Sequence, residues 1–228
     1  MTYQPDFTEL LKYPTTFASR PGDFSFWHKN RKHYAVWAIE LKNHVLCQLA
    51  GDARVYMSEF LLPDYPRQLH VTLGQCGFLS NKKNYADDYT EKDFQEDIRK
   101  LSELDRSTLT VKIGGVLCCF AIAPFFPILD EDGSLLELHK LMARSIDSEY
   151  VFTPHITLGL FCDDWPSSKV HEHVISYPGT ADCKIDIDEI KLFSYQADEV
   201  CGALTELACF SLREKRISYM SDILFSGS

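Results

Sequence analysis

Two short segments repeat one pattern of residues that could perform acid–base chemistry. One copy reads LHVTLG around His70 and Thr72, and the other reads PHITLG around His155 and Thr157. Side chains of a strand alternate between its two faces, so each histidine shares a face with its threonine. Imidazoles titrate near neutral pH, and hydroxyls donate hydrogen bonds. Two such pairs facing one cleft would supply an acid, a base and two anchoring donors.

This combination suits general acid–base catalysis. A base removes a proton from a nucleophile, and an acid protonates the leaving group. The hydroxyls of Thr72 and Thr157 would donate hydrogen bonds to a substrate and stabilise developing charge. A single strand histidine is more often structural, but the matched pair favours catalysis. The residues alone leave the substrate and the cleaved bond open.

The two copies predict a molecule built from two similar halves. His70 and His155 are 85 positions apart (155 − 70), and a predicted helix precedes each. Apolar runs and alternation predict strands at 34–41, 69–74, 108–113, 151–161, 185–195 and 208–212. The apolar run 116–129 predicts another strand, which ends near Pro124 or Pro127. Helix starts are predicted after Asn43, after Thr90 with Asp93, and at a capping box Ser134–Glu137, with a further helix over 167–177.

Composition limits the possible partners. The chain has 228 residues, 45% of them apolar, with a net charge of −10 and a pI of about 5.2. An acidic surface argues against duplex DNA, because nonspecific duplex binding needs basic side chains, but it is compatible with a small nucleotide or an RNA end. Eight cysteines without a C-x-x-C pair predict reduced thiols and no zinc site. Without a leader or an apolar span, we expect a cytoplasmic protein with no membrane partner.

The paired His-x-Thr-Leu segments resemble the motifs of the two-histidine phosphoesterase superfamily. That superfamily includes RNA 2′,3′-cyclic phosphodiesterases and the so-called 2′-5′ RNA ligases. The resemblance covers residues 33–213, leaving 1–32 as an N-terminal extension and 214–228 as a C-terminal tail. It implies an α+β fold of two lobes with pseudo-twofold symmetry, with antiparallel or mixed sheets flanked by helices and an active cleft between the lobes.

The resemblance also implies an activity. His70, Thr72, His155 and Thr157 fall on the catalytic motifs of a hydrolase that cleaves phosphodiesters without a metal or another cofactor. The implied substrate is an RNA end, a 2′-5′-linked oligonucleotide or a cyclic nucleotide or oligonucleotide. We expect a monomer.

Three further residues are candidates for substrate contacts. Arg67 precedes the first motif and could meet a phosphate, whereas Tyr195 and Trp37 carry rings that could stack on a base.

Two other functions stay open. A noncatalytic module that binds a nucleotide or RNA would keep the same cleft without turnover. A metallohydrolase could use His171, His173 and Asp163, although helical residues two positions apart do not share a face.

Overall fold

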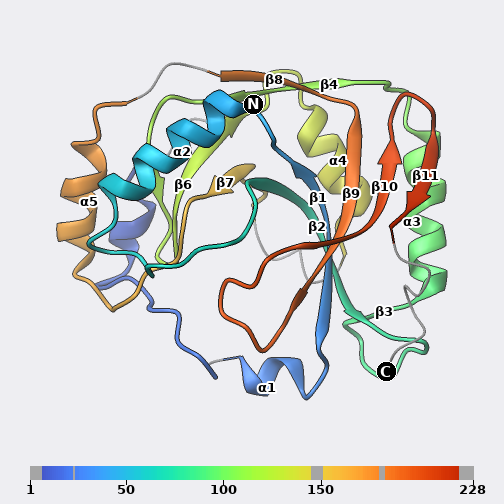
Figure 1. Ribbon diagram of the computed structural model, residues 1–228, viewed down its shortest axis with the longest axis horizontal. Helices are drawn as coiled ribbons and strands as arrows, with labels where there is room; N and C mark the ends of the chain where they lie inside the picture. The colour runs from blue at the N-terminus through green and yellow to red at the C-terminus, as the bar shows by residue number, and fades with distance from the viewer. Residues whose placement is uncertain (1–6, 23, 145–150, 180–182, 221–228) are drawn as a thin grey trace.

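The strands of the protein form two sheets, seen in a computed structural model that describes residues 7–22, 24–144, 151–179 and 183–220 (Figure 1). The larger sheet contains, in spatial order, β11 (Arg216–Tyr219), β10 (Thr205–Ser211), β9 (Glu189–Gln196), β1 (His33–Glu40), β2 (His70–Leu79) and β3 (Asp88–Tyr89). The smaller sheet contains β5 (Cys118–Cys119), β6 (Pro124–Leu129), β4 (Leu109–Ile113) and β8 (Cys183–Ile187), with β7 (His155–Thr157) paired to β6. The pairing is antiparallel except between β2 and β3.

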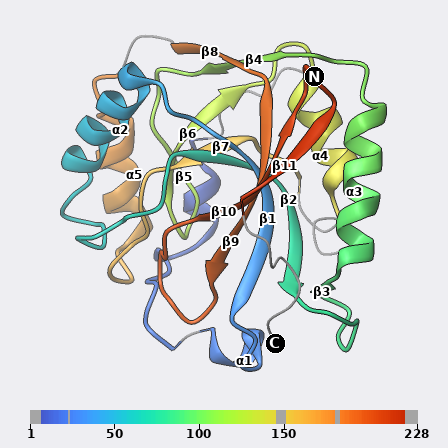
Figure 2. The same cartoon turned by 45° about the vertical axis from the view of Figure 1, so that its right-hand side comes forward.

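The helices are η1 (Glu9–Lys12), α1 (Ser25–His28), α2 (His44–Tyr56), α3 (Glu91–Glu103), α4 (Ser134–Met142) and α5 (Ser167–Ile175). The four longer ones flank the sheets in two groups. Helices α2 and α5 lie on one side of the molecule, and α3 and α4 lie on the other (Figures 1 and 2).

Each group takes one helix from each half of the chain. The Tyr56 hydroxyl of α2 donates to the His173 carbonyl of α5 at 2.9 Å, and their rings stack at 4.2 Å. Helices α3 and α4 are also in contact. The helices before the two motifs, α2 and α4, therefore each pack against the other half. This exchange, with the two sheets, confirms the predicted two-lobed α+β architecture.

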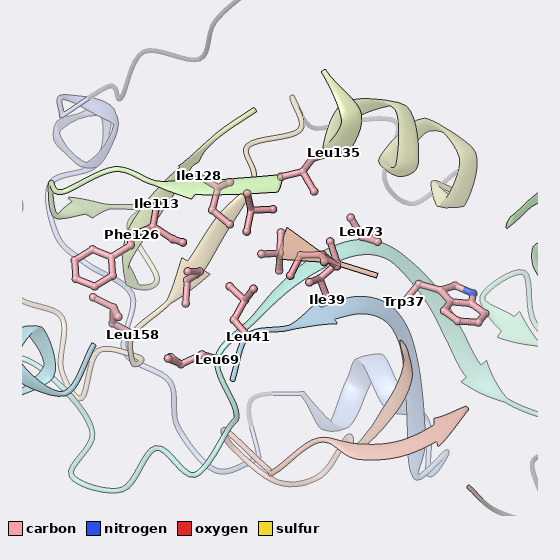
Figure 3. Close-up of a cluster of buried hydrophobic side chains, with 14 of the residues drawn as sticks. Trp37, Ile39, Leu41, Leu69, Leu73, Ile113, Phe126, Ile128, Leu135 and Leu158 are labelled. Atoms are coloured by element: carbon pink, nitrogen blue, oxygen red, sulfur yellow. The ribbon is translucent and has the colours of Figure 1, made fainter. Parts of the chain in front are cut away.

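The main core lies between the two sheets, where apolar side chains from both lobes meet (Figure 3). Val71 and Leu73 are fully buried in it, and alternation turns His70 and Thr72 to the opposite face of β2. Ile156 is fully buried in the same core. Each buried side chain of this size contributes roughly 1.5–3 kcal/mol relative to exposure, so the two motif strands rest on a rigid base.

The structure confirms one predicted strand and the predicted N-terminal caps of two helices. The strand over 34–41 is β1, and the side chain of Asn43 caps α2 by accepting from the Leu46 N–H at 3.1 Å. Thr90 and Asp93 form the capping box of α3.

Two predicted strands are each divided in the structure. The apolar run 116–129 forms β5 and β6, which are separated by a turn in which the Phe120 N–H donates to Ala123. The run 185–195 forms β8 and β9, which belong to different sheets and are divided at Asp188. Strand-forming residues continue through the break between β5 and β6 and through the break between β8 and β9. The sequence pattern therefore does not reveal where either predicted strand is divided. The second motif strand is also shorter than predicted, with three residues.

The predicted capping box at Ser134–Glu137 is wrong. Gly133 is the N-cap of α4, with φ 74°, and Ser134 already lies inside the helix. The Asp130 carboxylate accepts from the N–H groups of Leu135 and Leu136 at 3.0 and 2.9 Å. A carboxylate four residues before the helix therefore satisfies the free donors that the serine was expected to bond.

Ordered elements also occur in both segments predicted to flank the domain. Strand β11 falls within the predicted tail and pairs with β10. The N-terminal extension contains η1 and α1 and pairs with the second lobe through a bridge between Thr15 and Pro166. Parts of both predicted segments lie outside the described residues, namely 1–6, 23 and 221–228.

Candidate active site

The fold brings the two motif strands together. Strands β2 and β7 belong to different sheets, yet they are in contact. A proton added to the His155 ring lowers the pKa of His70, because two like charges repel each other. The predicted convergence of the two motifs therefore has a basis in the arrangement of the lobes.

The glycine that ends each motif makes room for the opposite half. A Cβ atom on Gly74 would lie 2.6 Å from the carbonyl oxygen of Met142, at the end of α4. A Cβ atom on Gly159 would lie 2.9 Å from Leu61, which follows α2. Gly74 meets rigid backbone, so a larger residue there would push α4 away from β2. The Leu-Gly ending is thus a packing requirement of the two-lobed fold.

Backbone carbonyls orient both imidazoles in the same way. His70 Nδ1 lies 2.7 Å from the oxygen of Gln68, and His155 Nδ1 lies 2.6 Å from the oxygen of Thr153. A carbonyl only accepts, so each Nδ1 must carry the proton and donate it. The Nε2 atom of each neutral ring is left as the proton acceptor.

Burial lowers the pKa of both histidines. The pKa of His70 falls to about 4, mainly through desolvation, while the Gln68 carbonyl opposes the change. Arg67 lowers this pKa further, and Glu40 raises it. Desolvation also lowers the pKa of His155, opposed by the Thr153 carbonyl. Both rings are therefore neutral at pH 7 in the free protein.

The two histidines have different cross-strand neighbours. His70 is opposite Glu40, whose carboxylate pairs with Lys191 and Lys42, each at 2.9 Å. His155 is instead opposite Pro127, on β6.

Aromatic rings surround the second histidine. The rings of Phe120 and Phe125 lie 5.1 and 5.3 Å from that of His155, both edge-on. The first histidine thus has charged neighbours and the second has aromatic ones.

A cleft of about 850 Å³ contains residues of both motifs, Thr72 from the first and His155 from the second. His70 and Thr157 are not among its lining residues. The other lining residues come from the N-terminal segment, β2, the 120–125 region, α4 and the chain before β7: Glu9, Lys12, Tyr13, Phe17, Leu73, Gly74, Gln75, Phe120, Ala121, Ile122, Phe125, His139, Val151, Phe152 and Thr153.

Sequence reasoning missed His139, which α4 presents to this cleft. Its Nδ1–H donates to the Leu73 carbonyl at 2.8 Å, and its ring stacks on Phe152 at 4.0 Å with an interplanar angle of 5°.

The first half has a counterpart to this residue. Arg54 of α2 donates from Nε to the carbonyl of Leu158 at 2.7 Å. Leu73 and Leu158 directly follow the motif threonines. Arg54 and His139 are separated by 85 positions (139 − 54), the same offset as the motif histidines. Every position has a counterpart at that offset and the two residue types differ, so no sequence signal singled out this pair.

Two predicted substrate residues lie together on the His70 side. The guanidinium of Arg67 is 4.5 Å from the centre of the Tyr195 ring, and its Nε donates to the Gly202 carbonyl at 3.0 Å. Both side chains are half-buried. Neither lines the 850 Å³ cleft, so their contact with a substrate stays a prediction.

Trp37 belongs to the core, and the substrate contact predicted for it is wrong. Its side chain has no exposed surface, and its Nε1–H donates to the carboxylate of Asp97 at 3.0 Å. A ring enclosed in this way has no face available for a base.

The structure gives no support to the metal cluster considered at 163–173. The His173 ring stacks on Tyr56, and its Nε2 lies 2.9 Å from the Tyr56 carbonyl. Within residues 7–22, 24–144, 151–179 and 183–220, no three His, Cys, Asp or Glu side chains form a group that could hold a metal ion.

Comparison with known proteins shows similarity in structure. No family model and no curated protein matches the sequence. The crystal structure of E. coli LigT complexed with NADP+ is 16% identical, with a TM-score of 0.51, covering 80% of this chain and 99% of that one. LigT complexed with ATP is 15% identical, with a TM-score of 0.51, covering 79% and 98%. A crystal structure described as a phosphoesterase is 15% identical, with a TM-score of 0.50, covering 79% and 98%.

The chain therefore shares the fold of LigT and of this phosphoesterase, which agrees with the fold that the paired motifs predict. In the part of the chain that the structure describes, no helix has the length and apolar character needed to cross a membrane.

Proposed function

We propose that this protein is a metal-independent phosphodiesterase in which His70 and His155 act as an acid–base pair. The observation that carries the proposal is the cleft that Thr72 of one motif shares with His155 of the other. The matching Nδ1–carbonyl bonds support it, because they leave the same nitrogen of both rings for proton transfer.

In the proposed reaction, one imidazole accepts a proton at Nε2 from water or from a ribose hydroxyl. The activated oxygen forms a bond to phosphorus, and the bond from phosphorus to the leaving oxygen breaks. The other imidazole, protonated, gives its proton to that oxygen. Thr72 and Thr157 donate hydrogen bonds to the nonbridging oxygens. A bound phosphodiester anion favours the charged form of a nearby imidazole, so substrate binding itself promotes protonation of the acid.

We infer that the substrate is small: an RNA end, a 2′-5′-linked oligonucleotide or a cyclic nucleotide. LigT structures hold NADP+ and ATP, which supports nucleotide binding by this fold. Among the described residues that line the cleft, Lys12 is the one lysine or arginine, and it pairs with Glu9. A cleft with so little positive charge suits a ligand with few phosphates better than a long polyanion.

The test is a substrate panel with products identified by mass. It contains 2′,3′-cyclic nucleotides, 2′-5′ and 3′-5′ oligomers and cyclic dinucleotides, each with and without EDTA. We expect turnover of at least one class, unchanged by EDTA and lost in His155→Ala. Turnover that persists in His155→Ala, or that EDTA abolishes and added metal restores, contradicts the proposal.

A noncatalytic nucleotide-binding module is the second candidate. The observation that favours it is the burial that lowers the pKa of both histidines, because a neutral ring has its one proton on Nδ1, bonded to a carbonyl, and none on Nε2 to donate. Binding of panel members without turnover at any pH between 4 and 8 would support this candidate.

A further inference from the structure

Residues 9–17 of the N-terminal extension form one fixed wall of the cleft. Thr16 is fully buried, and its N–H donates to the Trp165 carbonyl at 2.8 Å. Its hydroxyl donates to the Asp163 carbonyl at 2.9 Å and accepts from the Trp165 N–H at 2.8 Å. The Phe17 N–H donates to the Ala121 carbonyl at 2.7 Å. Backbone bonds to the second lobe thus hold this segment in place without a ligand.

This fixed wall presents two aromatic rings to the cleft. Tyr13 is 40% exposed and Phe17 is 46% exposed, and their rings meet edge-on at 5.2 Å. Ile122 and Val151, which also line the cleft, are 53% and 93% exposed. Grouped apolar exposure on an ordered segment is typical of a binding surface.

The charges near these rings select for a neutral ligand group. Glu9 and Lys12 are the charged lining residues of the wall, and they neutralise each other as an ion pair. Polar groups from the motifs lie elsewhere in the same cleft, at Thr72 and His155. One cleft therefore combines a phosphodiester-binding part with a part suited to an uncharged planar group.

We propose that Tyr13 and Phe17 form a specificity subsite that binds the base of the nucleotide whose phosphodiester is held at Thr72 and His155. This inference rests on the proposed function. Stacking on aromatic side chains tolerates different bases, since every base has a π-face. The subsite would thus distinguish a nucleotide from a sugar phosphate rather than one base from another.

The test compares two ligands that differ only in the base, adenosine 5′-monophosphate and ribose 5-phosphate. Their affinities are measured by calorimetry for the full-length protein and for Tyr13→Ala/Phe17→Ala. We expect the wild type to bind the nucleotide about tenfold more tightly, and the double variant to lose this preference while binding ribose 5-phosphate unchanged. The control is Phe26→Ala, because Phe26 is 89% exposed on α1 and does not line the cleft.

A wild type without the preference, or a double variant that keeps it, overturns the subsite. Turnover of the substrate panel separates this outcome from failure of the proposed function. If the wild type turns over a substrate and the double variant keeps the preference for the nucleotide, the subsite alone is overturned. A preference that depends on Tyr13 and Phe17, without any turnover, overturns the catalytic role alone.

Discussion

The two halves of this molecule hold the same pair of side chains in the same way but surround them differently. In both halves, a backbone carbonyl two residues before the histidine binds Nδ1. In the first half, Arg67 and Glu40 influence the pKa of His70, whereas in the second half Phe120 and Phe125 enclose His155. The scaffold thus fixes the position of each imidazole, and the neighbours set its proton affinity. The two imidazoles are held in the same way, yet their different neighbours allow one to act as the acid and the other as the base.

The helices that support the motifs show the same contrast. Arg54 and His139 occupy corresponding positions and bind corresponding carbonyls, those of Leu158 and Leu73. His139 also stacks on Phe152 in the cleft. The His139 side chain can therefore contact a ligand in the cleft, whereas Arg54 does not line this cleft.

The largest expected effect comes from removing either imidazole. His70→Ala and His155→Ala should each lower kcat by about 10²–10⁴-fold, because each removes one proton-transfer partner. The double variant should be little worse than either single variant, since the pair acts as a unit. Steady-state kinetics on the best panel substrate measures this, with His44→Ala, an exposed position, as the matched control. Full activity in one single variant would show that the two halves are not catalytic partners.

The next effect tests whether the threonines are equivalent. Thr72→Val and Thr157→Val keep the branched shape but remove the hydroxyl, so kcat should fall by about 10²–10³-fold in each. Thr110→Val on β4, an exposed position, provides the control. Melting temperatures near that of the wild type would separate lost transition-state binding from lost stability. A loss confined to one threonine would mean that only one half grips the phosphate.

A smaller effect is expected from the supporting helices. Arg54→Ala and His139→Ala each remove a hydrogen bond worth about 1 kcal/mol of stability. They should lower kcat by about tenfold, short of the roughly 10²-fold that a displacement of 1 Å can produce. His139→Asn tests the positioning role, because its side-chain amide can donate to the Leu73 carbonyl. Recovery of kcat in His139→Asn supports positioning, and an asparagine variant as poor as the alanine variant argues against it.

The pH profile gives the finest comparison of the two halves. The base works only above its pKa and the acid only below its own, so kcat/KM is largest between the two values. Desolvation lowers both, with that of His70 at about 4, so the maximum should lie below 6.5, the ordinary histidine value. Glu40 raises the pKa of His70, so Glu40→Gln should move one limb of the profile to lower pH. Movement of both limbs, or a maximum above pH 7, would contradict this assignment.

The sequence predicted the motif faces because alternation along a strand is a local property. Val71 and Ile156 enter the core, so their neighbours face away from it. Trp37 was misassigned because an aromatic ring on a strand can serve either a core or a ligand, and here both faces of β1 are buried. Its partner Asp97 lies 60 positions away, on another element.

The N-terminal wall was equally hidden from sequence reasoning. Its attachment depends on Thr16 meeting Trp165, a contact that spans 149 positions. Irregular segments carry no periodic pattern that could indicate such a partner. The relation between Arg54 and His139 was hidden as well, because the two residue types differ and only their bonds to corresponding carbonyls reveal it.

The exchange of helices between the lobes has a consequence for folding. Because α2 packs with α5, and α4 packs with α3, each half of the chain leaves one helix face unsatisfied until the other half has been synthesised. Neither lobe is then an autonomous folding unit, although the repeat invites that view. The molecule must assemble cooperatively through contacts distant in sequence, which slows folding. The two halves of the repeat thus form a single folding unit.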